Sequence, residues 1–112
     1  MSTLAHTVER SVLVEAPAEE VRQALRDEEF LSVWLEEDVE LTVEEAERVC
    51  FRWRREEWGE SEVELTVDAV AEGARVTVVE TRLGPTPSPL LAAAWAPRLA
   101  ALPLLLGRLV LA

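Results

Sequence analysis

Apolar and polar residues alternate along five stretches of the chain, and this pattern predicts strands with one face in water. The stretches are residues 7–15, 38–43, 48–54, 62–70 and 75–83. Because a parallel sheet is covered on both faces, such alternation indicates an antiparallel sheet. The positions expected to face inward are Val8, Arg10, Val12 and Val14, then Val39, Leu41 and Val43, then Val49, Phe51 and Trp53, then Val63, Leu65, Val67 and Ala69, and finally Val76, Val78 and Glu80.

Apolar residues recur at helical spacing in three other segments. A short helix is expected to begin at Pro17, since proline has no amide hydrogen for a strand but suits the first turn of a helix. A second short helix is predicted for residues 27–35. A long C-terminal helix is predicted from Ser88, and Pro103 is expected to kink or end it. The apolar stripe of this last helix is Leu91, Trp95, Leu99, Leu102, Leu106 and Leu109.

Composition and charge restrict the class of protein. A chain of 112 residues predicts one domain spanning 1–112. The net charge of −11 makes nucleic acid and anionic membranes poor partners. Arg98 and Arg108 interrupt the apolar C-terminal stretch, so we expect no membrane insertion, because a spanning helix needs about 20 apolar residues. No signal peptide is visible in residues 1–7, which predicts a cytoplasmic protein.

Four stretches resemble the SRPBCC (START-like, birch-pollen-allergen-like) superfamily, and within it the branch similar to activators of the heat-shock ATPase. The resemblance covers nearly the whole chain, in the family's order. The stretches are Val14-Glu-Ala-Pro-Ala-Glu-Glu-Val21, Phe30-Leu31-Ser-Val-Trp34, Glu47-Arg-Val-Cys-Phe-Arg-Trp53, and Gly73-Ala-Arg-Val-Thr-Val78 followed by Trp95, Leu99 and Leu102.

The resemblance implies an α+β helix-grip fold. In this fold a curved antiparallel sheet wraps around a long C-terminal helix, two short helices follow the first strand, and an apolar cavity often lies between sheet and helix. The chain departs from the family in two places. The hairpin before Glu47 is shortened, so the strand region is smaller, and Arg22 stands where the family often has a tryptophan.

The candidate ligand-binding residues combine apolar surface with one charged pair. In the resembled fold the first and last strands are antiparallel neighbours, and matching His6 with Leu83 places Arg10 near Glu80. Two inward charges must pair, because an unpaired buried charge costs several kcal/mol. Such a pair is either a structural ion pair or a contact for a polar ligand head. The full candidate set is Arg10, Trp34, Phe51, Trp53, Glu80, Trp95 and Leu99, although the three tryptophans also suit a small core.

Other chemistry-bearing residues give weaker signals. His6 is the only histidine, and Cys50 is the only cysteine, which excludes an internal disulfide. Cys50 shares its predicted strand face with Arg48 and Arg52, which could lower the pKa of its thiol, although a packing role is the simpler interpretation. Trp58 lies in a predicted turn and is equally suited to a contact site or to the core. No motif for catalysis or metal binding occurs, so we expect no catalytic residues, no metal and no cofactor.

Three functions fit this sequence. The first is a non-catalytic module that binds a small hydrophobic ligand between the sheet and the C-terminal helix. The second is a protein-interaction or co-chaperone-like module with a closed cavity. The third is a polyketide-cyclase-like enzyme, which is disfavoured because the chain has no tyrosine and no evident acid–base pair. Leucines on every side of the C-terminal helix also predict a homodimer through that helix.

Overall fold

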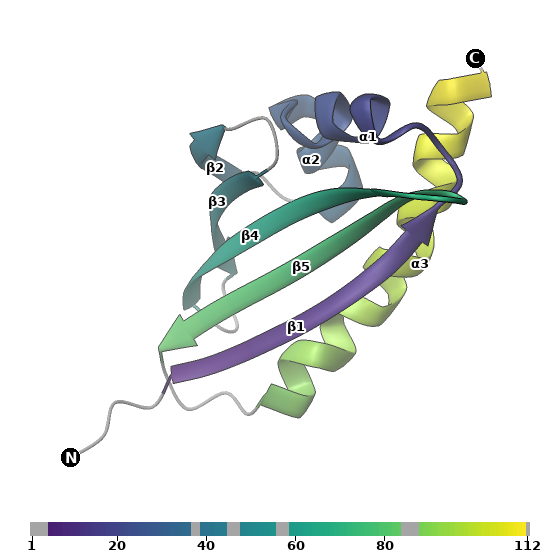
Figure 1. The fold of residues 1–112 in the computed structure, drawn as a ribbon. Coiled ribbons are helices and arrows are strands. Elements are labelled where there is room, and N and C mark those ends of the chain that lie inside the picture. The colour runs from purple at the N-terminus through teal and green to yellow at the C-terminus, as the bar shows by residue number, and fades with distance from the viewer. Residues whose placement is uncertain (1–4, 37–38, 45–47, 56–58, 84–87, 112) are drawn as a thin grey trace.

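The computed structural model describes residues 5–36, 39–44, 48–55, 59–83 and 88–111 (Figure 1). The elements follow the order strand, two helices, four strands, helix, as the alternation and helical spacing predicted. Their bounds are β1 Ala5–Val14, α1 Ala18–Leu25, α2 Glu28–Leu35, β2 Val39–Glu44, β3 Arg48–Arg55, β4 Gly59–Val70, β5 Gly73–Leu83 and α3 Ser88–Leu111.

The described strands form one antiparallel sheet in the order β1-β5-β4-β3-β2. The sheet curves, and α3 lies across its concave face while α1 and α2 cover one end (Figure 1). The prediction of an α+β fold with the C-terminal helix packed on the sheet is confirmed. The first and last strands are neighbours because β1 pairs with β5, which places β1 at one edge.

The core lies between the concave face of the sheet and the helices. Alternate residues along most of β3, β4 and β5 are buried, as the period of a strand requires. The buried strand residues include Val8, Val14, Val49, Phe51, Trp53, Val63, Leu65, Val67, Val76 and Val78. Leu31, Trp34 and Leu35 of α2 and Trp95, Leu99, Leu102 and Leu106 of α3 close the core from the other side.

Gly73 permits the turn from β4 into β5 to pass close to the end of β1. Its φ angle is +144°, a region that L side chains rarely adopt. A Cβ placed on Gly73 would lie 2.3 Å from the carbonyl oxygen of Val14. This position therefore requires glycine for both conformation and space.

Four local features differ from the expectations. Of the two outcomes expected at Pro103, a kink or an end, the end does not occur, because α3 continues to Leu111. The register of β1 with β5 places His6 opposite Arg82 rather than Leu83, and Arg10 opposite Val78. The pairing of β2 with β3 shifts between Leu41 and Val43, so that Val43 lies opposite Cys50. Ala69 is exposed rather than buried, near the end of β4.

Candidate functional site

Three tryptophans from different elements meet beneath α3. Trp95 of α3 stacks with Trp53 of β3 at a centroid distance of 5.5 Å and with Trp34 of α2 at 5.9 Å. Phe51 and Leu99 are also buried in this core. Five of the predicted ligand-binding residues therefore form one packed cluster. All five are side chains of the hydrophobic core.

Glu80 brings a carboxylate into the same core from β5. Its side chain is fully buried, at 0% exposure. The hydroxyl of Ser61 on β4 donates to Oε2 at 2.5 Å, and Trp95 Nε1 donates to Oε1 at 2.8 Å. Charge-assisted hydrogen bonds of this kind are the strong ones, so Glu80 links two strands to α3. Sequence reasoning missed Ser61, although its position two residues before Val63 places it on the inward face.

Arg10 lies apart from this cluster. It is exposed, and its guanidinium donates to the carbonyl oxygen of Glu9 at 2.8 Å. The expected ion pair between Arg10 and Glu80 is not formed within the described part of the chain, because the register pairs Glu80 with Val8. On an edge strand a long side chain at an inward position can reach water past the edge, and this explains the exposure of Arg10.

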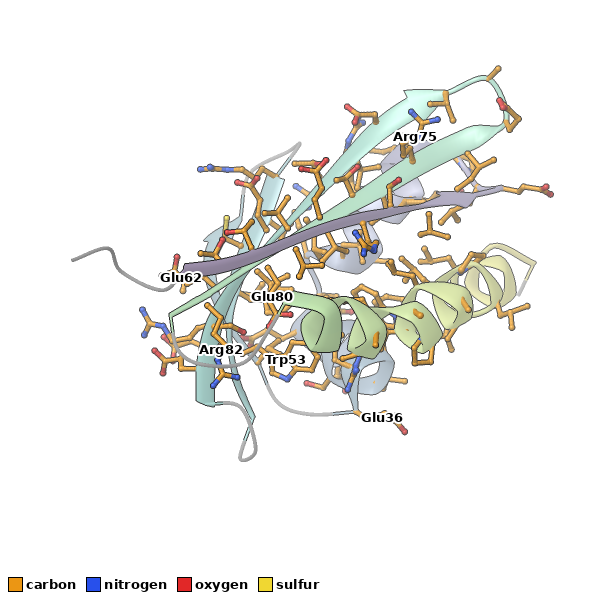
Figure 2. The ribbon with its side chains drawn as sticks, turned by 90° about the horizontal axis from the view of Figure 1, so that it is seen from below. Glu36, Trp53, Glu62, Arg75, Glu80 and Arg82 are labelled. Atoms are coloured by element: carbon orange, nitrogen blue, oxygen red, sulfur yellow. The ribbon has the colours of Figure 1, made fainter. Side chains whose placement is uncertain are left out.

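Arg82 is the charged residue on the inner face that sequence reasoning missed. It follows Val78 and Glu80 at strand spacing and is 9% exposed. Its Nε and Nη1 atoms are buried and have no hydrogen-bond partner among the described residues. Arg82, Glu80 and Trp53 lie at the same end of the sheet (Figure 2). Continuing the alternation of β5 by one more step would have found Arg82.

A groove with a volume of about 460 Å³ lies between α2 and α3. Its lining residues are Val33, Trp34, Glu36, Pro97, Arg98, Ala101, Leu104 and Leu105. Val33 and Leu104 are 66% and 69% exposed, so the walls of the groove present apolar surface to solvent. Trp34 contributes to this wall and to the aromatic cluster, and it therefore connects the two.

Arg98 holds one side of this groove in place. Its guanidinium lies 4.8 Å from the centroid of the Trp53 ring, and Nη1 donates to the carbonyl oxygen of Ala94. Its own carbonyl oxygen accepts a hydrogen bond of 2.8 Å from Trp34 Nε1. The cation–π contact and the hydrogen bond tie α3 to β3 and to α2. Arg98 and Glu36 are the charged residues among those that line the groove.

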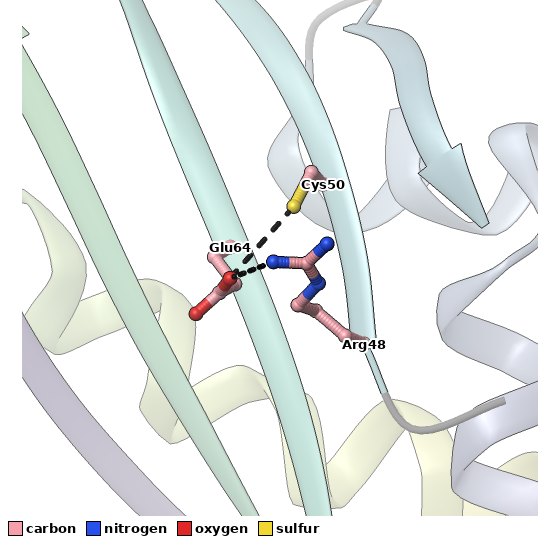
Figure 3. A network of polar contacts seen from close by, with 3 residues as sticks. All are labelled: Arg48, Cys50 and Glu64. Atoms are coloured by element: carbon pink, nitrogen blue, oxygen red, sulfur yellow. Dashed lines mark hydrogen bonds and ion pairs between the residues drawn. The ribbon is translucent and has the colours of Figure 1, made fainter. Parts of the chain in front are cut away.

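On the outer face of the sheet, Cys50 belongs to a polar cluster with Arg48 and Glu64 (Figure 3). Arg48 Nη1 lies 3.1 Å from Glu64 Oε2, and the Cys50 sulfur lies 4.0 Å from the same oxygen. Arg52 instead lies 3.8 Å from Glu40 and 3.5 Å from Glu60. The thiol therefore lies beside a carboxylate, and Arg52 pairs with other residues. The side chains of His6 and Trp58 lie outside the described residues.

The described residues hold no candidate metal site and no helix that could span a membrane. They contain no group of three or more His, Cys, Asp or Glu side chains arranged to hold a metal ion. Within the same residues, no helix combines the length and the apolar character needed to cross a bilayer.

Comparison with known proteins finds likeness in structure only. No protein-family model and no curated protein matches the sequence. A protein from Mesorhizobium loti aligns with a TM-score of 0.70 at 16% identity, over 92% of this chain and 98% of that one. A protein from Chromobacterium violaceum aligns with a TM-score of 0.66 at 18% identity, over 90% of this chain and 97% of that one.

Two further structural neighbours also align with most of this chain. The Aha1 dimer from Colwellia psychrerythraea aligns with a TM-score of 0.62 at 17% identity, over 86% of this chain and 92% of that one. DynU16, a protein of the dynemicin biosynthetic locus, aligns with a TM-score of 0.61 at 27% identity, over 86% of this chain but 45% of that one. These neighbours share the fold of this chain.

Proposed function

We propose that this protein is a non-catalytic module that binds a small hydrophobic ligand in the groove between α2 and α3. The observation that carries the proposal is the groove itself. A volume of about 460 Å³ lies within the range of roughly 300–1,000 Å³ typical of small-molecule sites. Such sites are mostly apolar with a few polar groups. Here the apolar groups are Val33, Trp34, Leu104 and Leu105, and the polar groups are Glu36 and Arg98.

The aromatic cluster supports the groove from behind. Trp53 and Trp95 are fully buried, and Trp34 is fixed by its hydrogen bond to the carbonyl of Arg98. A wall whose rotamers are fixed in this way loses little entropy when a ligand binds. In this proposal Trp34 contacts the ligand, while Phe51, Trp53, Trp95 and Leu99 position it and the helix. Glu80 fixes Trp95 through the indole nitrogen, and Arg10 has no contact with the groove.

The test uses 1-anilinonaphthalene-8-sulfonate as the apolar probe, followed by its fluorescence. The substitution Ala101→Trp fills the groove, because Ala101 is one of its lining residues. We expect saturable binding by the wild type and an affinity loss of about tenfold or more in Ala101→Trp, since the new indole occupies the space of the probe.

Ala96→Trp is the matched control. Ala96 is exposed on α3 and is not among the residues that line the groove. It adds the same indole to the same helix, so we expect it to bind the probe as the wild type does. Equal affinities in the two variants, or binding only by partly unfolded protein in near-ultraviolet circular dichroism, would contradict the proposal.

The second candidate is a protein-interaction module of the co-chaperone-like kind that forms a homodimer through α3. The exposed side chain of Leu104 and the likeness to the Aha1 dimer favour it. In that case a second copy, not a small molecule, covers the apolar wall of the groove. The two candidates differ in one measurable respect: probe binding would weaken as protein concentration rises if the dimer covers the groove.

A further inference from the structure

We propose that Arg82 is an internal anion site that takes the carboxylate of a small monocarboxylic acid. This site is separate from the groove between α2 and α3, because Arg82 is not among the residues that line the groove. The proposal begins from the position of Arg82 on the inner face of β5. Val76, Val78 and Glu80 precede it at alternate positions and are 0%, 1% and 0% exposed.

Two nitrogens of the Arg82 guanidinium, Nε and Nη1, are removed from water without gaining hydrogen bonds from the described residues in return. Arg82 is 9% exposed. An arginine stays charged in a protein, so burial cannot be relieved by loss of a proton. Buried cations are normally paired, and an anion that hydrogen-bonds to Arg82 would recover the lost solvation.

Glu80 does not fill this role. It lies two residues away on the same face, but its two oxygens accept from Ser61 and Trp95. Because Nε and Nη1 of Arg82 have no hydrogen-bond partner among the described residues, Glu80 does not bond to either of these atoms. Arg82 therefore differs from Arg48 and Arg52, which both reach carboxylates on the outer face.

Charge balance selects the class of anion. One unpaired guanidinium matches one negative charge, and a planar carboxylate matches the fork of an arginine. A doubly charged phosphate would place an excess charge beside the buried carboxylate of Glu80. The overall charge of −11 also opposes multiply charged anions. Arg82 lies one residue before the end of β5, at the end of the sheet where Glu80 and Trp53 also lie (Figure 2).

The test is a titration of the ¹⁵N-labelled protein with sodium benzoate, followed at the arginine Nε–H resonances. We expect one resonance, assigned to Arg82 by its loss in Arg82→Gln, to shift saturably downfield as the carboxylate accepts its hydrogen bond. Benzamide, which has the same ring without the charge, should not produce this shift. Arg82→Gln should weaken benzoate binding by about tenfold to a hundredfold.

Arg75→Gln is the matched control, because Arg75 lies on β5 but is exposed on the other face (Figure 2). It removes the same charge and should leave benzoate binding unchanged. If Arg82→Gln fails to fold, Arg82→Lys supplies the assignment, since it also removes the Nε–H group, and the assigned wild-type resonance then either shifts saturably or does not. The absence of such a shift, or equal effects of Arg75→Gln and Arg82→Gln, would overturn the site.

The groove-filling variant Ala101→Trp separates this proposal from the proposed function. It should abolish binding of the fluorescent probe while leaving the benzoate shift of Arg82 intact. Benzoate binding that disappears in Ala101→Trp and persists in Arg82→Gln would overturn the Arg82 site while leaving the groove as the ligand site.

Discussion

Glu80 combines full burial with hydrogen bonds from two different elements, so removing its charge tests the polar part of the core. In Glu80→Gln one of the two donors, Ser61 or Trp95, would face the amide NH₂ in place of an acceptor. We expect the free energy of unfolding to fall by about 1.5–3 kcal/mol, the usual worth of a hydrogen bond to a charged group. Urea unfolding followed by tryptophan fluorescence measures this loss.

Glu62→Gln is the control for this substitution. Glu62 is exposed on β4, and the change alters the net charge by the same amount (Figure 2). Its effect should stay within about 0.5 kcal/mol, as is usual for surface positions. Equal losses in the two variants would show that net charge, and not the bonds to Ser61 and Trp95, accounts for the effect.

Gly73 is the other residue whose identity the fold dictates. In Gly73→Ala the methyl group would overlap the Val14 carbonyl oxygen, and the backbone would hold an L residue at φ +144°. Overlap with backbone cannot be relieved by a rotamer change, so we expect a loss above about 2 kcal/mol. The midpoint of thermal unfolding measures it, with Ala71→Ser in the same turn as the control. A loss no larger than that of Ala71→Ser would contradict the geometry.

At the scale of elements, α2 ends on a strained residue. Glu36 at its C-terminus has φ 60°, the left-handed conformation in which glycine is favoured. Glu36→Gly should therefore raise the free energy of unfolding by about 0.5–1 kcal/mol. Glu29→Gly inside the same helix should lower it by about 1 kcal/mol, because glycine is a poor helix former. Chemical denaturation measures the free energy of unfolding of both variants, for which we expect changes of opposite sign. A decrease in both would contradict the proposal that Glu36 is strained.

The sequence was sufficient to predict the elements and their overall arrangement, but not every detail of strand register and side-chain packing. Alternation identified the strands because only one face of the sheet is buried, and the stripe of Trp95, Leu99, Leu102 and Leu106 identified the buried side of α3. Pro103 did not end the helix, since tertiary packing of Leu102 and Leu106 on either side holds the backbone helical.

The candidate site was less predictable, because it depends on pairing and packing between distant segments. The register places Val8, not Arg10, opposite Glu80, and the exposed Arg10 donates to the carbonyl oxygen of Glu9 instead. Hydrophobic pattern alone identifies Trp34, Trp53 and Trp95 as buried, but it does not distinguish residues that line a cavity from residues that fill it. The groove arises where two helices diverge, and no local pattern in either helix encodes that space.

At the scale of the whole molecule, the charges are separated along the chain. All 22 acidic residues lie at or before Glu80, and the charged residues after it are Arg82, Arg98 and Arg108. The helix α3 therefore carries only positive charge in a protein of net charge −11. Two copies that approach through α3 bring together their least repulsive surfaces, and the exposed side chain of Leu104 lies on this helix.

This distribution of charge yields the prediction on self-association. A symmetric dimer would bury the wall formed by Val33 and Leu104, the exposed large apolar residues that line the groove. Salt screens the long-range repulsion between the acidic parts far more than it weakens apolar contact. Sedimentation should therefore show a dimer whose affinity rises between low and moderate salt, and Leu104→Glu should shift it to monomer. Ala96→Glu adds the same charge to α3 outside the groove and should leave the dimer in place. A wild-type monomer at high micromolar concentration and moderate salt would refute the dimer and would leave the groove open to a small ligand.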